Sequence, residues 1–276
     1  MSVFSELPKH LVRYRPAGSA HLDDELKNLA EGKVFLQKLS LQNDQTEGRP
    51  QRLKCSTAEL MDLSRRLIQG SGNTLGHSHE LRQAGINRET TRTYLAKRRK
   101  WQKKFISIAP KHIRIACFSI ETKDNEGYMW REYGSNGCGF RLHFSFNQDV
   151  KPNRKSFWIR THYSHPRERR KISEAELLAA EFQINGANVF ANKPSQWIGI
   201  LQAFAACKPS KWAVEEELRL TKFSLSPSTK PKDSYIAVPP YSLSGVTFGW
   251  NADQDLINKV KQNLGDDLDY FFQQEP

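Results

Sequence analysis

Apolar residues recur along the chain at two different spacings. Spacings of three and four predict helices, because they place the apolar side chains along one helix face. Spacings of two predict strands, because successive side chains of a strand point to opposite faces of a sheet. Helices are predicted at residues 22–30, 56–68, 87–105, 173–182, 195–207 and 253–264, with a short helical turn at 129–133. Strands are predicted at residues 10–16, 33–41, 113–120, 140–146, 156–163, 221–225, 235–239 and 245–250.

This order of elements predicts an α+β fold with helical insertions between the strands. The sequence contains no internal repeat and no clear linker, so residues 1–276 are expected to form a single elaborated domain. A helical, strongly basic section at about residues 56–111 is predicted to be an insertion into that domain. The acidic segment 266–276 is expected to be loosely ordered.

A dense group of charges stands in residues 208–220, which read KPSKWAVEEELRL. As a strand, this stretch places Glu215, Glu217 and Arg219 on one face, while Glu216 points the other way. As a surface helix, it instead pairs Glu215 with Arg219, which contributes only about 0.2–0.5 kcal/mol. The apolar positions that follow at spacings of two favour the strand. We therefore expect Glu216 to tolerate substitution and Glu217 not to tolerate it.

The chain carries 42 Lys and Arg residues against 30 Asp and Glu, a formal net charge of +12. This excess favours a polyanionic partner, chiefly nucleic acid, and an acidic protein that covers the basic surface fits as well. The positive charge is densest in residues 87–105. Such a run is typical of a solvated helix face, and a stripe that binds nucleic acid, RNA in particular, is the sharper alternative. The candidate nucleic-acid-binding residues are Lys97, Arg98, Arg99, Lys100, Trp101, Lys103 and Lys104.

Several classes of protein are disfavoured by the sequence. No apolar run is long enough to span a bilayer, and no secretory signal is visible at the start. The 4 cysteines are scattered without a Cys-x-x-Cys pair, which favours a reducing cytoplasm over disulfides or a structural zinc site. His77-x-His79 and His162-x-x-His165 lack the ligand spacing of a metal centre. No common phosphate-binding loop and no Gly-x-Ser-x-Gly elbow is present. We expect a cytoplasmic protein that binds no metal and no membrane.

Four blocks of residues, in this order, resemble a widespread bacterial family, domain of unknown function twenty-nine seventy-one. The blocks are Arg13-Tyr14-Arg15; residues 32–44, which end in Asn43-Asp44; Cys117-Phe118-Ser119 with Met129-Trp130-x-x-Tyr133 and a Gly-rich link into an Arg-x-x-Phe strand; and Lys208-x-x-x-Trp212-x-x-Glu215-x-Glu217-x-Arg219 with residues 246–249. They span most of the chain. The second block departs from the family pattern, because Leu36-Gln37-Lys38 and Gln45 replace an aromatic-Ser-x-Pro end and a proline.

The layout also resembles the ADP-ribosyltransferase superfamily. Its members combine a first strand bearing His or Arg, a second strand bearing Tyr or Ser, and a late strand bearing the catalytic Glu, often as Glu-x-Glu. The resemblance implies a central, split, mostly antiparallel β-sheet and NAD as co-substrate. It implies that Glu217 and Glu215 are catalytic, whereas no Ser or Tyr stands at the end of the second strand. The NAD-binding residues that it implies are Arg13, Tyr14, Arg15, Asn43, Trp130, Tyr133 and Arg219.

These residue types suit that chemistry. Cleavage of the nicotinamide–ribose bond builds positive charge on the ribose, as in glycoside cleavage. A carboxylate stabilises such charge most where water is excluded, and this is the role expected of Glu217. Glu215 is expected to orient or deprotonate the nucleophile, and the arginines to clamp the pyrophosphate. Trp130 and Tyr133 either pack against nicotinamide or adenine or are ordinary core aromatics.

The leading hypothesis is an NAD-dependent ADP-ribosyltransferase that acts as a bacterial toxin or phage-defence effector on a nucleic acid, with an antitoxin-like protein as its inhibitory partner. The alternative is a non-catalytic nucleic-acid-binding or defence-associated interaction module, in which the Glu-x-Glu-x-Arg face is a structural ion-pair ladder. A metal-dependent nuclease would need Asp23, Asp24 and Asp44 to cluster with the glutamates, and no known spacing supports it.

Overall fold

The computed structural model describes residues 7–42, 44, 47–48, 51–53, 55–56, 58–59, 62, 93, 96, 99–100, 103, 106–107, 109–147, 149, 156–164, 171–173, 196–223 and 234–275. The helices predicted at residues 56–68, 87–105 and 173–182 lie largely outside these ranges. Within them, no helix combines the length and the apolar character that crossing a membrane requires.

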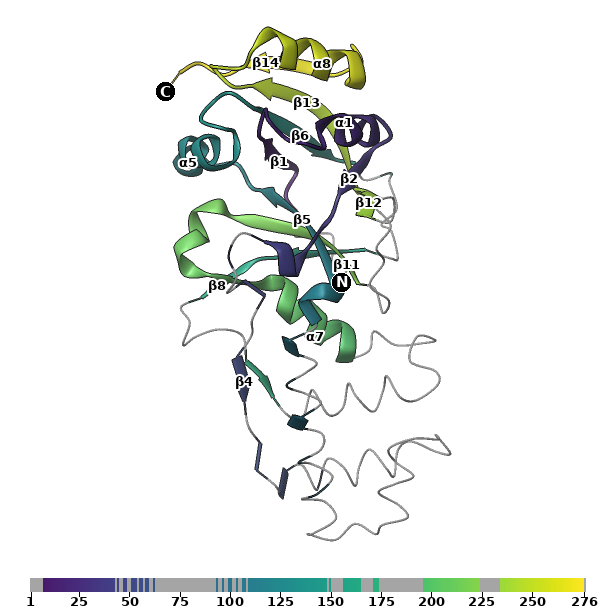
Figure 1. Cartoon of the computed structure of the whole chain (residues 1–276), viewed down its shortest axis with the longest axis vertical. Helices are drawn as coiled ribbons and strands as arrows, with labels where there is room; N and C mark the ends of the chain where they lie inside the picture. Colours follow the sequence, from purple (N-terminus) through teal and green to yellow (C-terminus); the bar gives the residue numbers. More distant parts are fainter. Residues whose placement is uncertain are drawn as a thin grey trace.

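One large sheet forms the centre of the molecule (Figure 1). Its strands run in the order β14-β13-β6-β1-β5-β11-β7, and β3 pairs with β5 beside this path. The strands are β1 (His10–Arg15), β3 (Gln37–Lys38), β5 (Ile113–Ser119), β6 (Phe140–Phe146), β7 (Phe157–Arg160), β11 (Glu217–Phe223), β13 (Tyr241–Phe248) and β14 (Asp269–Phe272). β13 and β14 run parallel, and the other described pairs of this sheet are antiparallel. The prediction of a mixed fold with a mostly antiparallel sheet is therefore confirmed.

Three strand pairs lie beside the large sheet. β2 (Lys33–Phe35) pairs with β12 (Tyr235–Ala237), β8 (His162–Ser164) with β10 (Cys207–Pro209), and β4 (Gln51–Leu53) with β9 (Lys171–Ser173). The pair of β8 and β10 matters most for function, because it lies next to the start of β11 and holds the lysine described below.

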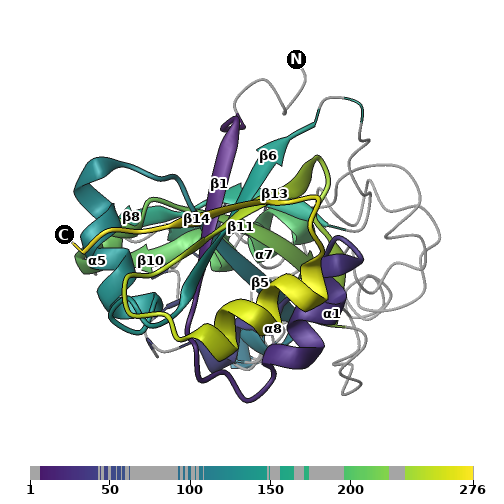
Figure 2. The same ribbon diagram turned by 90° about the horizontal axis from the view of Figure 1, so that it is seen from above.

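Two helices cover one face of the large sheet. α1 (Leu22–Ala30) and α8 (Gln254–Leu264) lie side by side on it (Figures 1 and 2). Leu26 of α1 and Val260 of α8 join Leu11 and Leu142 of the strands in the main hydrophobic core. Both helices were predicted because their apolar residues recur at helical spacing, and burial of that apolar stripe is what stabilises them.

The opposite face is covered by two other helices. α5 (Lys123–Tyr133) packs Met129 and Trp130 against Val12 and Tyr14 of β1. α7 (Gln196–Ala206) packs against β5, β7 and β11 farther along the sheet. Since neighbouring residues of a strand point to opposite faces, β1 presents Val12 and Tyr14 to α5, and Leu11 to the core under α1 and α8.

The sheet is split between β1 and β5. β1 pairs with β6 from His10 to Arg15, yet it meets β5 only where Val12 lies opposite Ser119. β5 is instead paired with β11 along its whole length. The two halves of the sheet therefore diverge at this place, and side chains from both faces of β1 border the gap.

Two local predictions were wrong. The helical turn predicted at residues 129–133 is the end of an 11-residue helix, α5. It begins at Lys123 because Asn125 caps it: the Thr122 N–H donates to Asn125 Oδ1 at 3.1 Å. The strand predicted at residues 33–41 is divided into β2, β3 and the 3₁₀ helix η2 (Leu39–Leu41), since β2 pairs with β12 and β3 pairs with β5.

The acidic segment at the end of the sequence was also wrongly expected to be loosely ordered. It contains β14, which extends the sheet by pairing in parallel with β13. The Tyr270 ring stacks on Phe248 with ring centroids 6.1 Å apart. Aromatic packing and backbone hydrogen bonds therefore outweigh the acidic composition of the segment.

Candidate active site

A tight corner carries the charged stretch at the start of β11. η3 (Ser210–Glu215) is a 3₁₀ helix, and Glu216 joins it to β11 in the left-handed region with φ 44° and ψ 51°. The prediction of one strand through residues 208–220 was therefore wrong before Glu217, because the chain turns at Glu216. Glu215 and Glu217 are buried, whereas Glu216 is exposed. The predicted separation of Glu216 from its two neighbours is thus confirmed.

Glu217 is held in place by two cations and a tyrosine. Its Oε2 accepts hydrogen bonds from Nε and Nη2 of Arg219 at 2.9 and 2.6 Å. Its Oε1 accepts one from Nζ of Lys208 at 2.9 Å. The backbone N–H of Glu217 donates to the Tyr163 hydroxyl at 2.7 Å. Both the carboxylate and the backbone at the start of β11 are therefore fixed in one orientation.

Lys208 links the two buried glutamates. Its Nζ donates to Oε2 of Glu215 as well as to Oε1 of Glu217, and its side chain is only 6% exposed. The other oxygen of Glu215, Oε1, accepts a hydrogen bond from the Tyr133 hydroxyl at 2.7 Å. Lys208 was not among the predicted site residues, and its place in the fourth family block was the only signal for it in the sequence. β10 brings it to the site by pairing with β8.

Arg219 is the most deeply buried cation of this cluster. Its Nη2 also donates to Oε1 of Glu47, at 2.5 Å, and its Nη1 donates to the carbonyl oxygen of Ala205 at 2.7 Å. The Arg219 side chain is 0% exposed, and it does not border the cavity described below. The expectation that Arg219 clamps a pyrophosphate is therefore not supported, since protein atoms already occupy its donors.

The cluster separates the proton affinities of its carboxylates. Burial alone would raise the pKa of Glu217, but the charges of Arg219 and Lys208 outweigh it and hold that pKa well below its usual range. Burial and the neighbouring charge of Glu217 raise the pKa of Glu215 to about 7. Burial likewise raises the pKa of Glu47. Glu217 is thus ionised at neutral pH, while Glu215 exchanges a proton in the neutral range.

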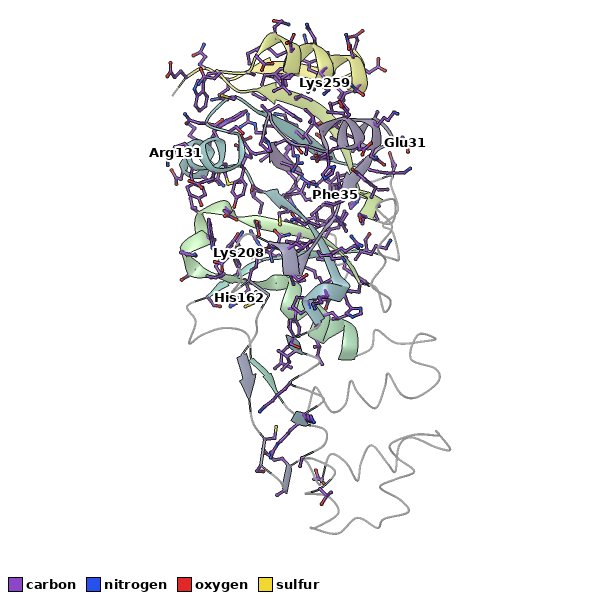
Figure 3. The ribbon with its side chains drawn as sticks, in the orientation of Figure 1. Glu31, Phe35, Arg131, His162, Lys208 and Lys259 are labelled. Atoms are coloured by element: carbon purple, nitrogen blue, oxygen red, sulfur yellow. The ribbon has the colours of Figure 1, made fainter. Side chains whose placement is uncertain are left out.

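A cavity of about 470 Å³ lies in the gap between β1 and β5. It falls within the range of about 300–1,000 Å³ that is typical of small-molecule sites. Glu217 and Tyr133 border it from the α5 side, and Arg13, Arg15 and Glu25 border it from the α1 side. Figure 3 places Phe35, which also lines the cavity, and Lys208 in the middle of the molecule, although they are far apart in the sequence. The split of the sheet therefore brings residues from both of its faces to one space.

Arg13 is a partly buried cation, and among the described residues no carboxylate is bonded to it. Its Nη2 donates to the carbonyl oxygen of Phe35 at 3.3 Å, and its Nη1 has no hydrogen-bond partner among the described residues. Burial, followed by repulsion from Arg15, lowers the pKa of Arg13 to about 10. Since an uncompensated buried charge is costly, an anionic ligand in the cavity would stabilise this guanidinium.

The aromatic residues of the predicted site divide into two groups. Tyr133 and Tyr14 border the cavity. Trp130 does not border it; it is 1% exposed and meets the Tyr14 ring edge-to-face with ring centroids 5.1 Å apart. Of the two interpretations of Trp130, the core aromatic is the one that fits its position.

The remaining predicted site residues are Asn43 and the members of the basic stretch. Asn43, Lys97, Arg98, Trp101 and Lys104 lie outside the described residues. The remaining members of the basic stretch, Arg99, Lys100 and Lys103, are described. Lys100 and Lys103 are exposed, and Arg99 is half-buried.

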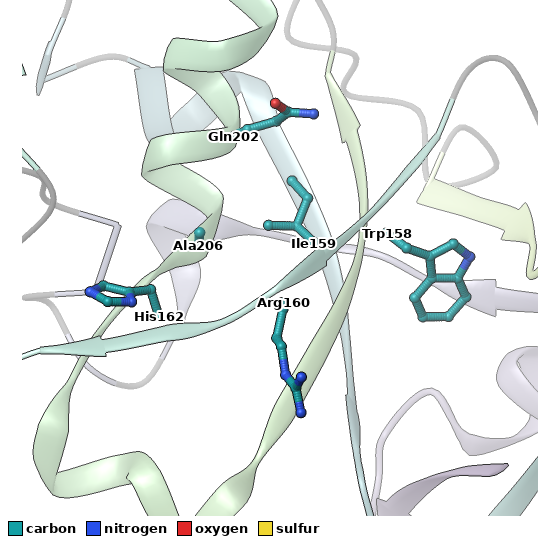
Figure 4. A pocket seen from close by; sticks show the side chains of 6 residues that line it. All are labelled: Trp158, Ile159, Arg160, His162, Gln202 and Ala206. Carbon is teal, nitrogen blue, oxygen red and sulfur yellow. The ribbon is translucent and has the colours of Figure 1, made fainter. Parts of the chain in front are cut away.

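A second hollow lies between β7, β8 and α7, with a volume of about 530 Å³. Figure 4 shows Ile159 pointing toward α7, which carries Gln202 and Ala206, while Arg160 and Trp158 point away from that helix. No carboxylate is among the described residues that line this hollow. His162, which was weighed as a metal ligand, lies here. In the described part of the chain, no group of three or more His, Cys, Asp or Glu residues is placed to hold a metal.

The sequence was compared with models of known protein families. The model of a family described as "Protein of unknown function (DUF2971)" matches residues 129–220. The match begins inside α5 and ends inside β11, so it contains Tyr133, Lys208, Glu215, Glu217 and Arg219. It supports the resemblance to that family, whose description names no activity. No curated protein and no solved structure matches the chain.

Proposed function

We propose that the protein is an NAD-dependent ADP-ribosyltransferase that holds the dinucleotide in the gap between β1 and β5. One observation carries the proposal: the ionised carboxylate of Glu217 borders the same cavity as the guanidinium of Arg13, whose Nη1 is buried without a hydrogen-bond partner among the described residues. A dinucleotide with an anionic pyrophosphate and a ribose that develops positive charge matches this pair of opposite charges. The cavity volume and the burial of Glu217 and of the Nη1 atom of Arg13 are compatible with a site from which water is largely excluded.

Glu217 would stabilise the reacting ribose. The bond between ribose C1′ and the nicotinamide nitrogen breaks, and its electron pair leaves with neutral nicotinamide. The positive charge that develops on the ribose resembles the transition state of glycoside cleavage. Because Lys208 and Arg219 keep Glu217 ionised and immobile, its negative charge needs no reorganisation when the ribose becomes positive.

Glu215 would take up the proton of the acceptor, and Tyr133 would carry it there. Glu215 does not border the cavity, whereas Tyr133 borders it and donates its hydroxyl proton to Glu215. As the acceptor atom bonds to C1′, its proton passes to the Tyr133 oxygen while the tyrosine proton passes to Glu215. Such a relay needs Glu215 without its proton. The role expected of Glu215 from the sequence is therefore kept, but it runs through a tyrosine.

The acceptor that fits the charge of the chain best is a nucleic acid. A net charge of +12 attracts phosphate backbones through counterion release, and Lys100 and Lys103 are exposed. Transfer of ADP-ribose to RNA would suit a bacterial toxin or a phage-defence effector, and an acidic antitoxin-like protein could cover the same charge.

The test is transfer of label from adenylate-labelled NAD to total RNA, DNA or cell lysate by the full chain. We expect Glu217→Gln to lower the transfer rate by about 10²–10³-fold, as loss of one electrostatic contact in a buried site does. Glu216→Gln is the matched control, because Glu216 is exposed next to the same site; it should keep the wild-type rate.

Three outcomes would count against the proposal. Equal labelling by the wild type and by Glu217→Gln would remove Glu217 from the chemistry. Absence of NAD binding, together with absence of labelling in every fraction, would remove the enzyme class. Salt-sensitive RNA binding, together with absence of NAD binding and of labelling, would instead favour a nucleic-acid-binding module.

A further inference from the structure

An ion pair borders the cavity on the side of α1. Nη2 of Arg15, on β1, donates to Oε2 of Glu25, on α1. Both residues line the cavity, and their side chains are 20% and 3% exposed. The last residue of β1 is thereby tied to the first turn of α1, and the pair as a whole carries no net charge.

The pair leaves two polar atoms without partners. Oε1 of Glu25 and Nε of Arg15 are buried and make no hydrogen bond among the described residues. A buried polar atom without a partner destabilises the fold, so a group that bonds to both atoms would be stabilised here. The free carboxylate oxygen can only accept a hydrogen bond. A ligand group that meets it must therefore be a donor, such as a ribose hydroxyl, and cannot be a phosphate.

We infer that the Arg15–Glu25 pair makes the cavity selective for NAD over NADP, with Glu25 accepting a hydrogen bond from a hydroxyl of the adenosine ribose. The inference rests on the proposed function, because it takes a nicotinamide dinucleotide as the ligand. In dinucleotide sites of another fold, an acidic residue likewise binds the ribose 2′-hydroxyl, and an arginine accommodates the 2′-phosphate. Here both residue types are present, and the Glu25 carboxylate accepts a hydrogen bond from the Arg15 guanidinium.

The 2′-phosphate of NADP would meet two obstacles at this pair. It replaces the hydroxyl donor by oxygens that only accept, and it brings negative charge next to the buried carboxylate of Glu25. Arg15 could neutralise a phosphate, yet its Nη2 is already bonded to Glu25. Removal of the Glu25 charge would reverse both effects, because Arg15 would then be free to bind the phosphate bidentately.

The experiment measures the dissociation constants of NAD and NADP by titration calorimetry on the full chain. Wild type should bind NADP at least ten-fold more weakly than NAD. Glu25→Gln should shift the ratio of the two constants toward NADP by ten-fold or more. The double variant Glu25→Gln with Arg15→Gln should lose that shift, since no guanidinium is then available at this position.

Glu31→Gln is the matched control for the loss of one acidic charge on α1. Glu31 caps the end of α1 and pairs with Lys33 at 2.5 Å, outside the cavity. It should leave the NAD:NADP ratio at the wild-type value. A thermal unfolding scan of each variant shows whether it is folded, and the wild-type ratio tests the inference even if Glu25→Gln does not fold.

The outcomes separate this inference from the proposed function. If wild type binds neither dinucleotide, the proposed function fails and the inference fails with it. If wild type binds NAD and NADP equally well, or Glu25→Gln leaves the ratio unchanged, only the inference fails. An equal shift in Glu25→Gln and in the double variant would show that Arg15 does not bind the phosphate, which would also overturn it.

Discussion

Lys208→Met tests whether the buried cluster depends on one bridging cation. The substitution keeps a long side chain in place of Lys208 but removes the charge that bonds to both Glu215 and Glu217. Three buried carboxylates, Glu47, Glu215 and Glu217, then have one remaining cation in the cluster, Arg219, which is bonded directly to Glu217 and Glu47 but not to Glu215. Loss of one partner from a buried ion pair destabilises a protein by about 3–5 kcal/mol. The melting temperature should therefore fall by roughly 6–20 °C.

The loss of stability caused by Lys208→Met should depend on pH. Without the ammonium group, burial is opposed less strongly, so the pKa of Glu215 and that of Glu217 both rise in the folded variant. When the pKa of a carboxyl is higher in the folded than in the unfolded state, the protein loses stability as the pH rises from the unfolded-state pKa through the folded-state pKa. In the wild type the pKa of Glu217 is lowered. Its contribution to the stability of the fold is therefore present above the unfolded-state pKa and is lost as the pH falls. The deficit of Lys208→Met should thus be small near pH 4 and largest near pH 8.

Urea unfolding at pH 5, 6.5 and 8 measures this deficit. Lys211→Met is the control, because Lys211 is 66% exposed and pairs with Asp44 at 3.1 Å on the surface; its loss should cost no more than about 1 kcal/mol at any of these pH values. A deficit for Lys208→Met below about 1 kcal/mol, or one that stays constant from pH 5 to 8, would refute the assignment of Lys208 as the bridging cation.

Two further predictions concern the proton relay and the close approach of Gly139 to the end of β1. The transfer rate should rise with pH through about 7, because Glu215 must lose its proton to act as a base. The variant Tyr133→Phe should lower the transfer rate at every pH. A flat pH–rate profile, or full activity of Tyr133→Phe, would contradict the relay. Gly139→Ala should destabilise the fold by more than about 2 kcal/mol, because the added Cβ would lie 2.1 Å from the carbonyl oxygen of Arg15. The control in urea unfolding is Gly127→Ala in α5, because a Cβ at Gly127 has nothing within 4 Å. This variant should stabilise the helix by up to about 1 kcal/mol. Equal effects of the two substitutions would contradict the contact between Gly139 and Arg15.

Local periodicity was sufficient for elements whose apolar side chains face one core. α1 and α8 have clear apolar stripes, and β6 alternates apolar and polar residues, so the type and the position of these elements could be predicted. Prediction failed where a partner far away in the sequence decided the backbone. Residues 33–41 broke into short pieces because two different strands pair with them. β14 formed in an acidic segment because β13 offered an edge to pair with.

The candidate site shows the same division. Glu215, Glu217 and Arg219 could be selected from the sequence because charges of opposite sign stand close together in an apolar context. Lys208 could not, because a lysine at that position is equally typical of a solvated surface. The roles of two residues differ from those predicted. Arg219 bonds to protein atoms instead of a ligand. Tyr133 donates to Glu215 from α5, a helix of which only the last part was predicted.

Composition and local pattern were enough to predict the mixed α and β class, the basic charge and the acidic residues near the start of β11. Only the tertiary structure decided that Glu217 shares a cavity with Arg13 and Arg15, and that Glu47 and Lys208 complete its environment. The physical reason is range. Periodicity and capping act between residues a few positions apart, whereas a buried charge is stabilised by whichever opposite charges the fold brings within hydrogen-bond distance, and Glu47 and Arg219 are 172 positions apart.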